Sequence, residues 1–172
     1  MDLNFVAPDL RKLDETSAEI LACPIWREER PMRGLAGLLD WRLAGRLSRL
    51  QREDYLKGEL GEVLCIPGRP RLPFDKVLIF GLGSRTTFGE ATFRQVVTHL
   101  LHTLEGLRVR RAVVQLPGRV DGQVSAEDAA AILVECVGDS PAHDAWWLVE
   151  DAEAGKRMMK RAVDEQRRAR RA

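Results

Sequence analysis

The sequence predicts a single three-layer α/β/α domain, in which a mixed and mostly parallel sheet lies between two layers of helices. Short apolar runs of strand length alternate along the chain with longer segments of helical period, which is typical of a sheet covered on both faces. The chain has 172 residues, 45% apolar and 31% charged, as expected for one globular domain with its own core. Two strands open the chain in succession, so we expect part of the sheet to be antiparallel.

The opening strands are expected at residues 3–7 and 19–26, where short apolar runs occur. Pro24 interrupts the second run, so we expect that strand to be irregular or to lie at an edge. From Arg33 the pattern becomes helical, and an amphipathic helix should end before Gly58. The apolar positions of this helix are Leu35, Leu39, Leu43, Leu47 and Leu50.

Two further strands are expected in residues 61–85, the most informative stretch of the chain. They occupy residues 62–66 and 76–80, and each is followed by turn residues that contain glycine. Both runs are apolar at consecutive positions, so both faces of each strand would be buried. This pattern predicts two central strands.

The second half of the chain continues the alternation. An apolar stripe that begins at Phe93 predicts a helix that stops near Gly106, and an apolar strand follows at residues 111–116. Ser125, with an aspartate three residues later, resembles a capping box and opens an alanine-rich helix. A last strand is expected at residues 145–149, ahead of a C-terminal helix.

Residues 151–172 form a basic helix or tail attached to a domain of residues 1–150. In its last part eight basic residues face two acidic ones, a net charge of +6; since the whole chain carries +1, the remainder carries −5. A solvated helix end, an acidic partner surface and nucleic acid phosphates all remain possible, although the absence of aromatic residues disfavours base recognition. The basic residues are Lys156, Arg157, Lys160, Arg161, Arg167, Arg168, Arg170 and Arg171.

The N-terminal sequence and the cysteines bear on the location of the protein. The first eight residues lack the basic start and apolar run of a secretory signal, and no stretch approaches the ~20 apolar residues of a membrane span. Cys23, Cys65 and Cys136 are odd in number and set among apolar residues, so we interpret them as buried thiols in a reducing compartment. We therefore expect a cytoplasmic protein without a membrane partner.

No pattern of residue types predicts a catalytic centre. A zinc site needs three or four converging ligands, and His99 and His102 share a helix face with no third ligand supplied by a motif; two exposed histidines are the simpler interpretation. No serine occupies a Gly-x-Ser-x-Gly turn, and the carboxylates are scattered. We expect no catalytic residue, no metal and no cofactor.

The turn after residues 76–80 is the best candidate for ligand contact, through Gly81, Gly83, Ser84 and Arg85. Glycines after a central strand let the backbone approach a phosphate, and the N-terminus of a following helix attracts it. However, the third glycine of a dinucleotide fingerprint is missing, and four residues delay the helix. A tight structural turn is therefore the alternative that we favour.

Three motifs follow one another in this part of the chain: Asp54-Tyr-Leu-Lys-Gly58, Gly61-Glu-Val-Leu-Cys-Ile-Pro-Gly68 and Lys76-Val-Leu-Ile-Phe-Gly-Leu-Gly-Ser-Arg85. Their order and spacing resemble the N-terminal domain of the leucyl aminopeptidase, or cytosol aminopeptidase, family, in which F-x-G-x-x-G-E, an apolar strand and V-L-L-V-G-L-G-x-R are typical. The resemblance covers approximately residues 20–137. The basic tail is not typical of that domain.

The resemblance implies a macro-domain-like α/β/α fold. It also implies that the two metal ions and the catalytic lysine and arginine of the family belong to a separate C-terminal domain, marked by Asn-Thr-Asp-Ala-Glu-Gly-Arg-Leu, which this sequence does not contain. No catalytic residue can be carried over. In the family the N-terminal domain lies outside the active site and helps to shape hexamers and contacts between domains.

Three functions from different classes are compatible with these observations. The one we favour is a non-catalytic interaction or regulatory module that binds itself or another protein; exposure of Trp41, Trp146 or Trp147 would support it, whereas core tryptophans would not. The second is a nucleotide or ADP-ribose binder that uses residues 81–85, by analogy with macro domains. The third is a nucleic-acid-associated protein that uses the basic tail.

Overall fold

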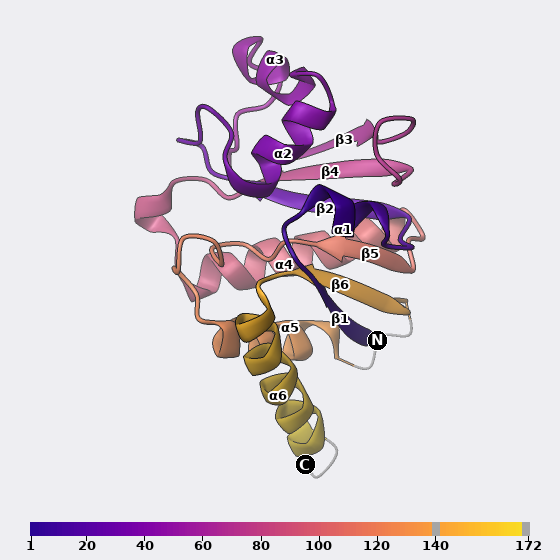
Figure 1. Ribbon diagram of the computed structural model, residues 1–172. Coiled ribbons are helices and arrows are strands. Elements are labelled where there is room, and N and C mark those ends of the chain that lie inside the picture. The colour runs from indigo at the N-terminus through magenta and orange to yellow at the C-terminus, as the bar shows by residue number, and fades with distance from the viewer. Residues whose placement is uncertain (139–141, 170–172) are drawn as a thin grey trace.

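The computed structural model describes residues 1–138 and 142–169 (Figure 1). Six strands form one sheet in the order β1-β6-β5-β2-β4-β3. The strands are β1 (Asp2–Val6), β2 (Ile20–Ile25), β3 (Val63–Pro67), β4 (Lys76–Gly81), β5 (Arg111–Val114) and β6 (Ala145–Val149). The helices are α1 (Leu10–Asp14), α2 (Gly34–Arg42), α3 (Arg46–Arg52), α4 (Glu90–Gly106), α5 (Ala126–Val137) and α6 (Ala152–Ala169), with a short 3-10 helix, η1 (Arg85–Thr87).

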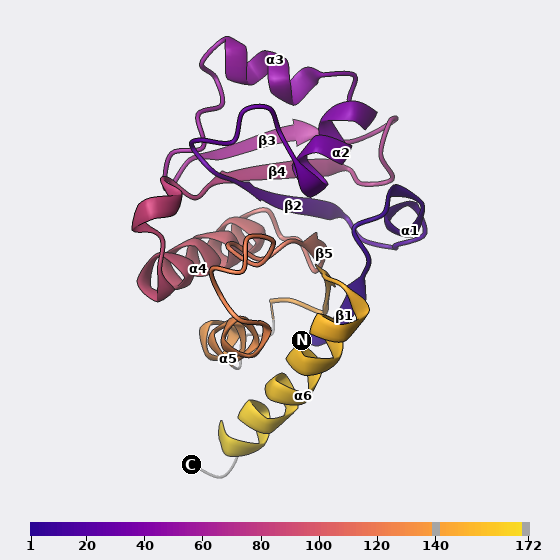
Figure 2. The same ribbon diagram turned by 60° about the vertical axis from the view of Figure 1, so that its left-hand side comes forward.

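Helices cover both faces of this sheet, which confirms the predicted three-layer α/β/α fold (Figure 2). Along β2, alternate residues enter different cores: Ile20 and Ala22 pack toward α4, α5 and α6, while Leu21 and Cys23 pack toward α1, α2 and α3. This alternation follows from the two-residue period of a strand. The capping box is also confirmed, because the Ser125 hydroxyl accepts a hydrogen bond from the Asp128 amide at 3.0 Å.

The antiparallel part of the sheet is the β3–β4 pair, and the prediction that the opening strands supply it was wrong. β1 pairs in parallel with β6, while β2 lies between β4 and β5 and runs parallel to both. A short helix that the sequence patterns had not indicated, α1, separates the two opening strands. Asp9 begins α1, since its carboxylate accepts hydrogen bonds from the amides of Arg11 and Lys12.

β4 is a central strand as predicted, but β2 and β3 have exchanged the places expected for them. β2 is central and buried although it contains Pro24, because its pairing with β5 ends at Ala22, so the missing N–H of Pro24 leaves no gap in that ladder. β3 is an edge strand. Its Cys65 is exposed, which corrects the interpretation of all three cysteines as buried thiols; Cys23 is buried and Cys136 is half-buried.

The long helix expected after Arg33 is two helices, α2 and α3. The chain breaks between them at Ala44 and Gly45, which have φ values of 55° and 75°. Glycine enters this left-handed region without a steric penalty, so Gly45 allows the break. Asp40 holds the junction, since its carboxylate accepts hydrogen bonds from the amide and the hydroxyl of Ser48. The leucine stripe remains buried across the break.

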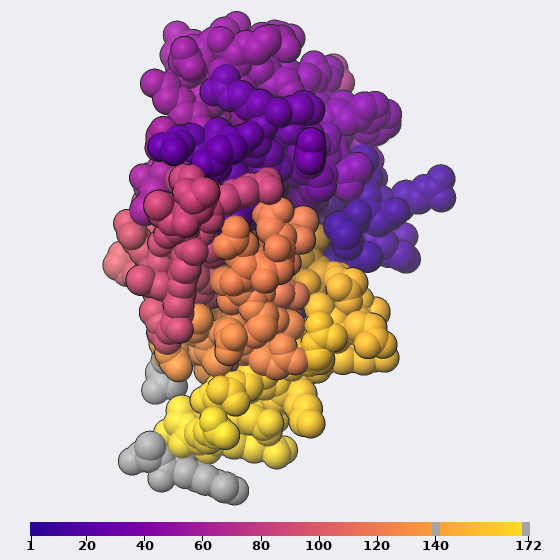
Figure 3. Space-filling view, turned by 90° about the vertical axis from the view of Figure 1, so that its left-hand side faces the viewer, coloured from indigo at the N-terminus to yellow at the C-terminus, as the bar shows by residue number. Residues whose placement is uncertain are grey.

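The C-terminal helix α6 packs on the domain along its first half. Ala154 and Met158 lie in the same core as Trp146, and Ala162 is buried as well. The helix then extends past the sheet (Figure 2), and in the space-filling view its yellow surface lies against the orange surface of α5 (Figure 3). No helix in the described part of the chain combines the length and apolar composition needed to cross a membrane.

Candidate functional site

A cavity of about 150 Å³ lies where the parallel strands β2, β4 and β5 end. The connection that leaves β2 leads toward β3 and β4, whereas the connection that leaves β5 leads to β6 on the other side. In open α/β sheets, ligands bind in the crevice that such a divergence creates beyond the carboxyl ends of the strands. The cavity is lined by Pro24, Trp26, Glu29, Arg33, Gly34, Leu35, Leu82, Arg85, Gln115, Leu116, Gly118, Val120 and Asp121.

The Gly81–Arg85 turn lies beside this cavity, and the amides of its first three residues already donate hydrogen bonds to backbone carbonyls. The amides of Gly81, Leu82 and Gly83 donate to the carbonyls of Glu62, Ile25 and Gly58, each at 2.9 Å. A phosphate cradle would need such donors free. The turn thus offers a ligand mainly side chains, and of its four candidate residues only Arg85 lines the cavity.

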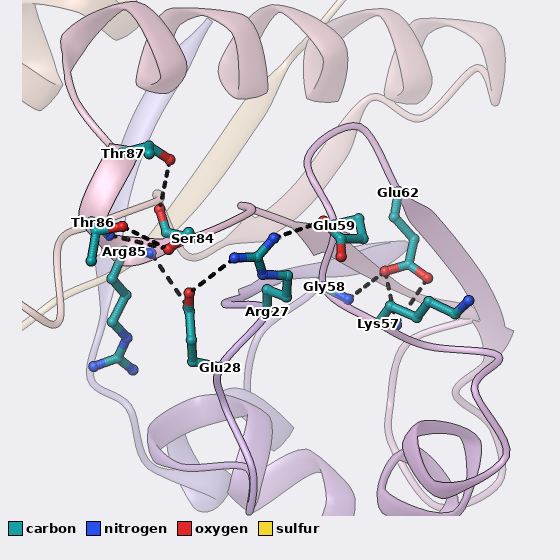
Figure 4. A network of polar contacts seen from close by, with 10 residues as sticks. All are labelled: Arg27, Glu28, Lys57, Gly58, Glu59, Glu62, Ser84, Arg85, Thr86 and Thr87. Atoms are coloured by element: carbon teal, nitrogen blue, oxygen red, sulfur yellow. Dashed lines mark hydrogen bonds and ion pairs between the residues drawn. The ribbon is translucent and has the colours of Figure 1, made fainter.

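Glycine at position 81 is required by the loop that crosses it. A Cβ at Gly81 would lie 1.8 Å from the carbonyl oxygen of Glu59, and one at Gly58 would lie 2.7 Å from the carbonyl oxygen of Trp26. The Glu62 carboxylate fixes this loop by accepting hydrogen bonds from the amides of Lys57 and Gly58 (Figure 4). The motif that resembles F-x-G-x-x-G-E therefore joins the ends of β2 and β4 to the start of β3.

An exposed polar network follows the outer side of the turn (Figure 4). Ser84 is the N-cap residue of η1. A hydrogen bond from its hydroxyl to Glu28 lowers the pKa of the Glu28 carboxyl below its usual value. Glu28 also accepts a hydrogen bond from the Arg85 amide at 3.3 Å and lies 3.9 Å from the Arg27 guanidinium. Arg27 in turn lies 3.8 Å from Glu59. Ser84 thus stabilises the turn, and its hydroxyl points to this network.

The wall of the cavity nearest the turn is a cluster of Trp26, Arg85 and Asp121. The Trp26 indole donates to Asp121 Oδ2 at 2.5 Å, and Arg85 Nη1 lies 3.2 Å from Asp121 Oδ1. The Arg85 guanidinium also lies 5.5 Å from the Trp26 ring, and its Nε is buried without a hydrogen-bond partner among the described residues. Motif reasoning found Arg85 but missed Trp26 and Asp121, which are 95 residues apart in sequence.

Gln115 supplies the most deeply buried polar side chain of the cavity. It is 6% exposed, and its carbonyl Oε1 meets only the Cys23 thiol, at 3.7 Å. Its Nε2 donates no hydrogen bond to any residue in the described ranges. Burial raises the pKa of the Cys23 thiol well above its usual value, with a smaller effect of Glu29 in the same direction, so Cys23 is not an activated nucleophile.

The loop that carries Gln115 and Asp121 is anchored by a buried ion pair between Arg119 and Glu150. The two side chains are 10% and 8% exposed, and Arg119 donates to both carboxylate oxygens, at 2.7 and 3.2 Å. Arg119 Nη1 also donates to the Val124 carbonyl at 2.6 Å. These bonds tie the loop after β5 to the residue that follows β6, and they fix one wall of the cavity.

Other residues that the sequence singled out lie elsewhere. His99 and His102 are exposed on α4, and no group of three His, Cys, Asp or Glu side chains within residues 1–138 and 142–169 is placed to hold a metal ion. Trp41 is 74% exposed, whereas Trp146 is fully buried and Trp147 is half-buried. Of the three tryptophans considered as an interaction surface, only Trp41 is therefore well exposed.

The basic residues of α6 are partly neutralised. Arg157 pairs with Glu127 at 3.2 Å, and Glu165 pairs with Arg161 at 2.7 Å and with Arg168 at 3.1 Å. Among the described residues, Lys156, Lys160 and Arg167 form no ion pair with a carboxylate. Arg170 and Arg171 lie outside the described residues.

Comparison with known proteins places these features in a family. The family model described as the N-terminal domain of the cytosol aminopeptidase family matches residues 22–140. A probable cytosol aminopeptidase from Halorhodospira halophila is 37% identical over 90 residues, which are 52% of this chain and 18% of that protein. One from Alkaliphilus metalliredigens is 25% identical over 124 residues, which are 72% of this chain and 25% of that protein. The matched part of this chain spans a quarter or less of the length of these relatives.

Solved structures share the fold at low sequence identity. A tomato leucine aminopeptidase mutant superimposes with a TM-score of 0.64 and 14% identity, over 92% of this chain and 35% of that one. A Trypanosoma brucei macrodomain in complex with ADP superimposes with a TM-score of 0.70 and 16% identity, over 92% of this chain and 68% of that one. These matches confirm the predicted macro-domain-like architecture.

Proposed function

The chain belongs to the cytosol aminopeptidase family through that family's N-terminal domain, and from this premise we propose that it acts as a non-catalytic module for protein interaction. The match lies in the N-terminal domain, and the resemblance places the family's catalytic residues in another domain. The observation that carries the proposal is a groove at one edge of the sheet, between β1 and α6, in which exposed apolar side chains lie beside polar ones.

This β1–α6 groove combines an edge strand with exposed apolar side chains. β1 is the last strand on its side of the sheet, so one row of its backbone N–H and C=O groups faces no neighbouring strand. On α6, Met159 and Val163 are 38% and 36% exposed, although apolar residues of their size are usually buried. The groove is lined by Met1, Asp2, Leu3, Asn4, Met159, Ala162, Val163 and Gln166.

A second copy of this chain is the occupant that we propose for the groove. An edge strand can pair antiparallel with the same strand of another copy about a two-fold axis, and the two α6 helices would then lie beside the shared sheet. Met159 and Val163 would be removed from water in such a dimer. Main-chain hydrogen bonds and apolar burial would thus act together.

Light scattering coupled to size-exclusion chromatography over a concentration series tests this proposal. The wild-type chain should show a dimer that dissociates on dilution, and Val163→Glu should shift it to monomer because a carboxylate would be buried in the interface. Leu107→Glu is the matched control, since Leu107 is 42% exposed and lies outside the groove. A wild-type monomer at every concentration, or equal effects of both variants, would contradict self-association through this groove.

Aminopeptidase activity is tested directly with leucine amide as substrate and added manganese or zinc. We expect no hydrolysis above the blank. Turnover that co-purifies with the chain would contradict a non-catalytic role.

A nucleotide or ADP-ribose ligand is the second candidate, and the position of the cavity at the strand ends favours it. Its volume, about 150 Å³, lies below the ~300–1,000 Å³ of sites that hold drug-sized ligands. Isothermal titration with ADP-ribose and with ADP separates the two functions. Heat at micromolar ligand would support this candidate, and none at millimolar ligand would exclude it.

Nucleic acid binding through α6 is a third candidate that rests on its unpaired basic residues. Truncation at residue 156 is a poor test because it would remove Met158 from the core. The triple substitution Lys156→Gln, Lys160→Gln and Arg167→Gln leaves the ion pairs of α6 in place. If the wild-type chain binds DNA through α6, this variant should weaken salt-sensitive retention, which an unchanged variant would contradict.

A further inference from the structure

We propose that the cavity at the ends of β2, β4 and β5 binds a free apolar amino acid. The first argument is size. A cavity of about 150 Å³ matches the volume that takes up one benzene molecule, so it holds one small molecule rather than a nucleotide or a peptide. The site is separate from the β1–α6 groove, because the two share no lining residue.

The second argument is charge. Two positive side chains, Arg33 and Arg85, and two negative ones, Glu29 and Asp121, line the cavity, so their formal charges cancel. Arg85 and Asp121 already pair with each other, which leaves Arg33 and Glu29 as the other two charged residues of the lining. A ligand that carries one charge of each sign and no net charge matches this arrangement. Free amino acids are the commonest small molecules of that kind.

The third argument is unused hydrogen-bonding capacity. Gln115 Nε2, on a side chain 94% buried, has no partner among the described residues although it belongs to the cavity wall. The N-terminus of α2 also reaches the cavity at Gly34 and Leu35, and the side chain of its N-cap residue, Arg33, makes no capping hydrogen bond. The first amides of a helix have no partner within the helix, and together with Gln115 Nε2 they suit the carboxylate of the ligand.

The fourth argument concerns the remaining ligand groups. Each oxygen of Glu29 accepts one backbone amide, from Arg33 at 3.3 Å and from Trp26 at 3.2 Å, and retains a further lone pair for an ammonium group. Leu82, Leu116 and the buried Trp26 supply an apolar wall for the side chain. Carboxylate, ammonium and apolar side chain thus each have a partner in one cavity.

Calorimetric titration of the full chain with L-leucine and three partial analogues tests the proposal. 4-Methylpentanoate lacks the ammonium group, isoamylamine lacks the carboxylate, and glycine lacks the apolar side chain. L-leucine should bind, and each analogue should bind about tenfold more weakly or worse, as one lost charged hydrogen bond or one unfilled apolar wall implies. No heat with millimolar L-leucine, or equal binding of any analogue, would overturn the proposal.

Two substitutions locate the binding. Gln115→Met keeps the side-chain volume and removes the donor, so it should weaken L-leucine binding about tenfold. Gln95→Met, on the exposed face of α4, should leave binding unchanged and is the matched control. Equal affinities in the two variants would show that the ligand lies elsewhere and would overturn the assignment.

A second variant keeps the test valid if Gln115→Met does not fold. Glu29→Gln removes the negative charge proposed to meet the ammonium group, so 4-methylpentanoate should then bind as well as L-leucine does. In the wild-type chain the Trp26 indole N–H resonance should move when L-leucine is added, while that of Trp41, which lies outside the cavity, should not. Preference for L-leucine retained in Glu29→Gln, or an unmoved Trp26 signal, would contradict the proposal.

Discussion

The two ends of the sheet hold their loops together in different ways. Beyond the carboxyl ends of the strands, Arg119 and Glu150 form an almost fully buried ion pair, with bonds of 2.7 and 3.2 Å. Beyond the amino ends, Arg110 pairs with Asp144, and both side chains are more than half exposed. A buried pair holds its loop in one geometry, whereas an exposed pair competes with water and salt. The cavity lies at the end where the loops are fixed.

A buried histidine makes the amino end different in a second respect. His143 is 3% exposed, and Glu105 Oε1 lies 3.6 Å from its Nε2. Burial lowers the pKa of His143, against a smaller opposing effect of Glu105. The carboxyl end thus contains a satisfied charge pair, and the amino end a buried group that resists protonation.

The largest expected effect is at the carboxyl end. Arg119→Met should lower the free energy of unfolding by about 3–5 kcal/mol, because it leaves Glu150 buried without its partner. Urea denaturation measures this loss. The double variant Arg119→Met with Glu150→Gln should recover part of it, and a single variant that costs less than about 1 kcal/mol would place this pair with ordinary surface pairs.

The next effect concerns the crossing of the 58–62 loop over β4. Gly81→Ala should destabilise the chain by about 1–3 kcal/mol or more, because the new Cβ would overlap the carbonyl of Glu59 and backbone must move. Gly106→Ala is the control, since a Cβ there meets no atom within 4 Å. Equal melting temperatures for the two variants would contradict the close approach.

Lowering the pH should reduce the stability of the folded chain through His143, which is buried at the amino end of the sheet. Its pKa in the folded chain lies below the ordinary value of about 6.5, so below that pH the unfolded chain binds a proton that the folded chain does not. Stability from this source is complete above pH 6.5 and falls as the pH decreases. His143→Gln should therefore show a smaller loss of stability between pH 7.5 and 5 than the wild type, while the exposed His102→Gln should match the wild type.

The smallest effect is expected for the exposed pair at the amino end. Arg110→Met should move the urea midpoint far less than Arg119→Met does, because water already screens the Arg110–Asp144 pair. Raising the salt concentration should reduce the difference from wild type further. A loss as large as that of Arg119→Met would show that the two ends of the sheet are held equally firmly.

Much of the fold was predictable because its signals are local. The apolar runs of β4 and β6 and the stripe of α4 lie within single segments, and the structure has them where the sequence predicts them. The candidate site was less predictable. Arg85 stood out in a glycine-containing turn, but Trp26, Gln115 and Asp121 carry no motif, and only the pairing of distant strands brings them together.

The sequence by itself determined the layers of this protein and the turn at Gly81–Gly83, because periodicity, capping and glycine requirements act over a few neighbouring residues. The order and spacing of its motifs also indicated the family that the comparison shows. The tertiary structure alone decided that β2 is central and β3 is an edge, that Cys65 is exposed, and that Gln115 ends in a cavity. Whether a strand is buried depends on which strands lie beside it, and those neighbours come from remote parts of the chain.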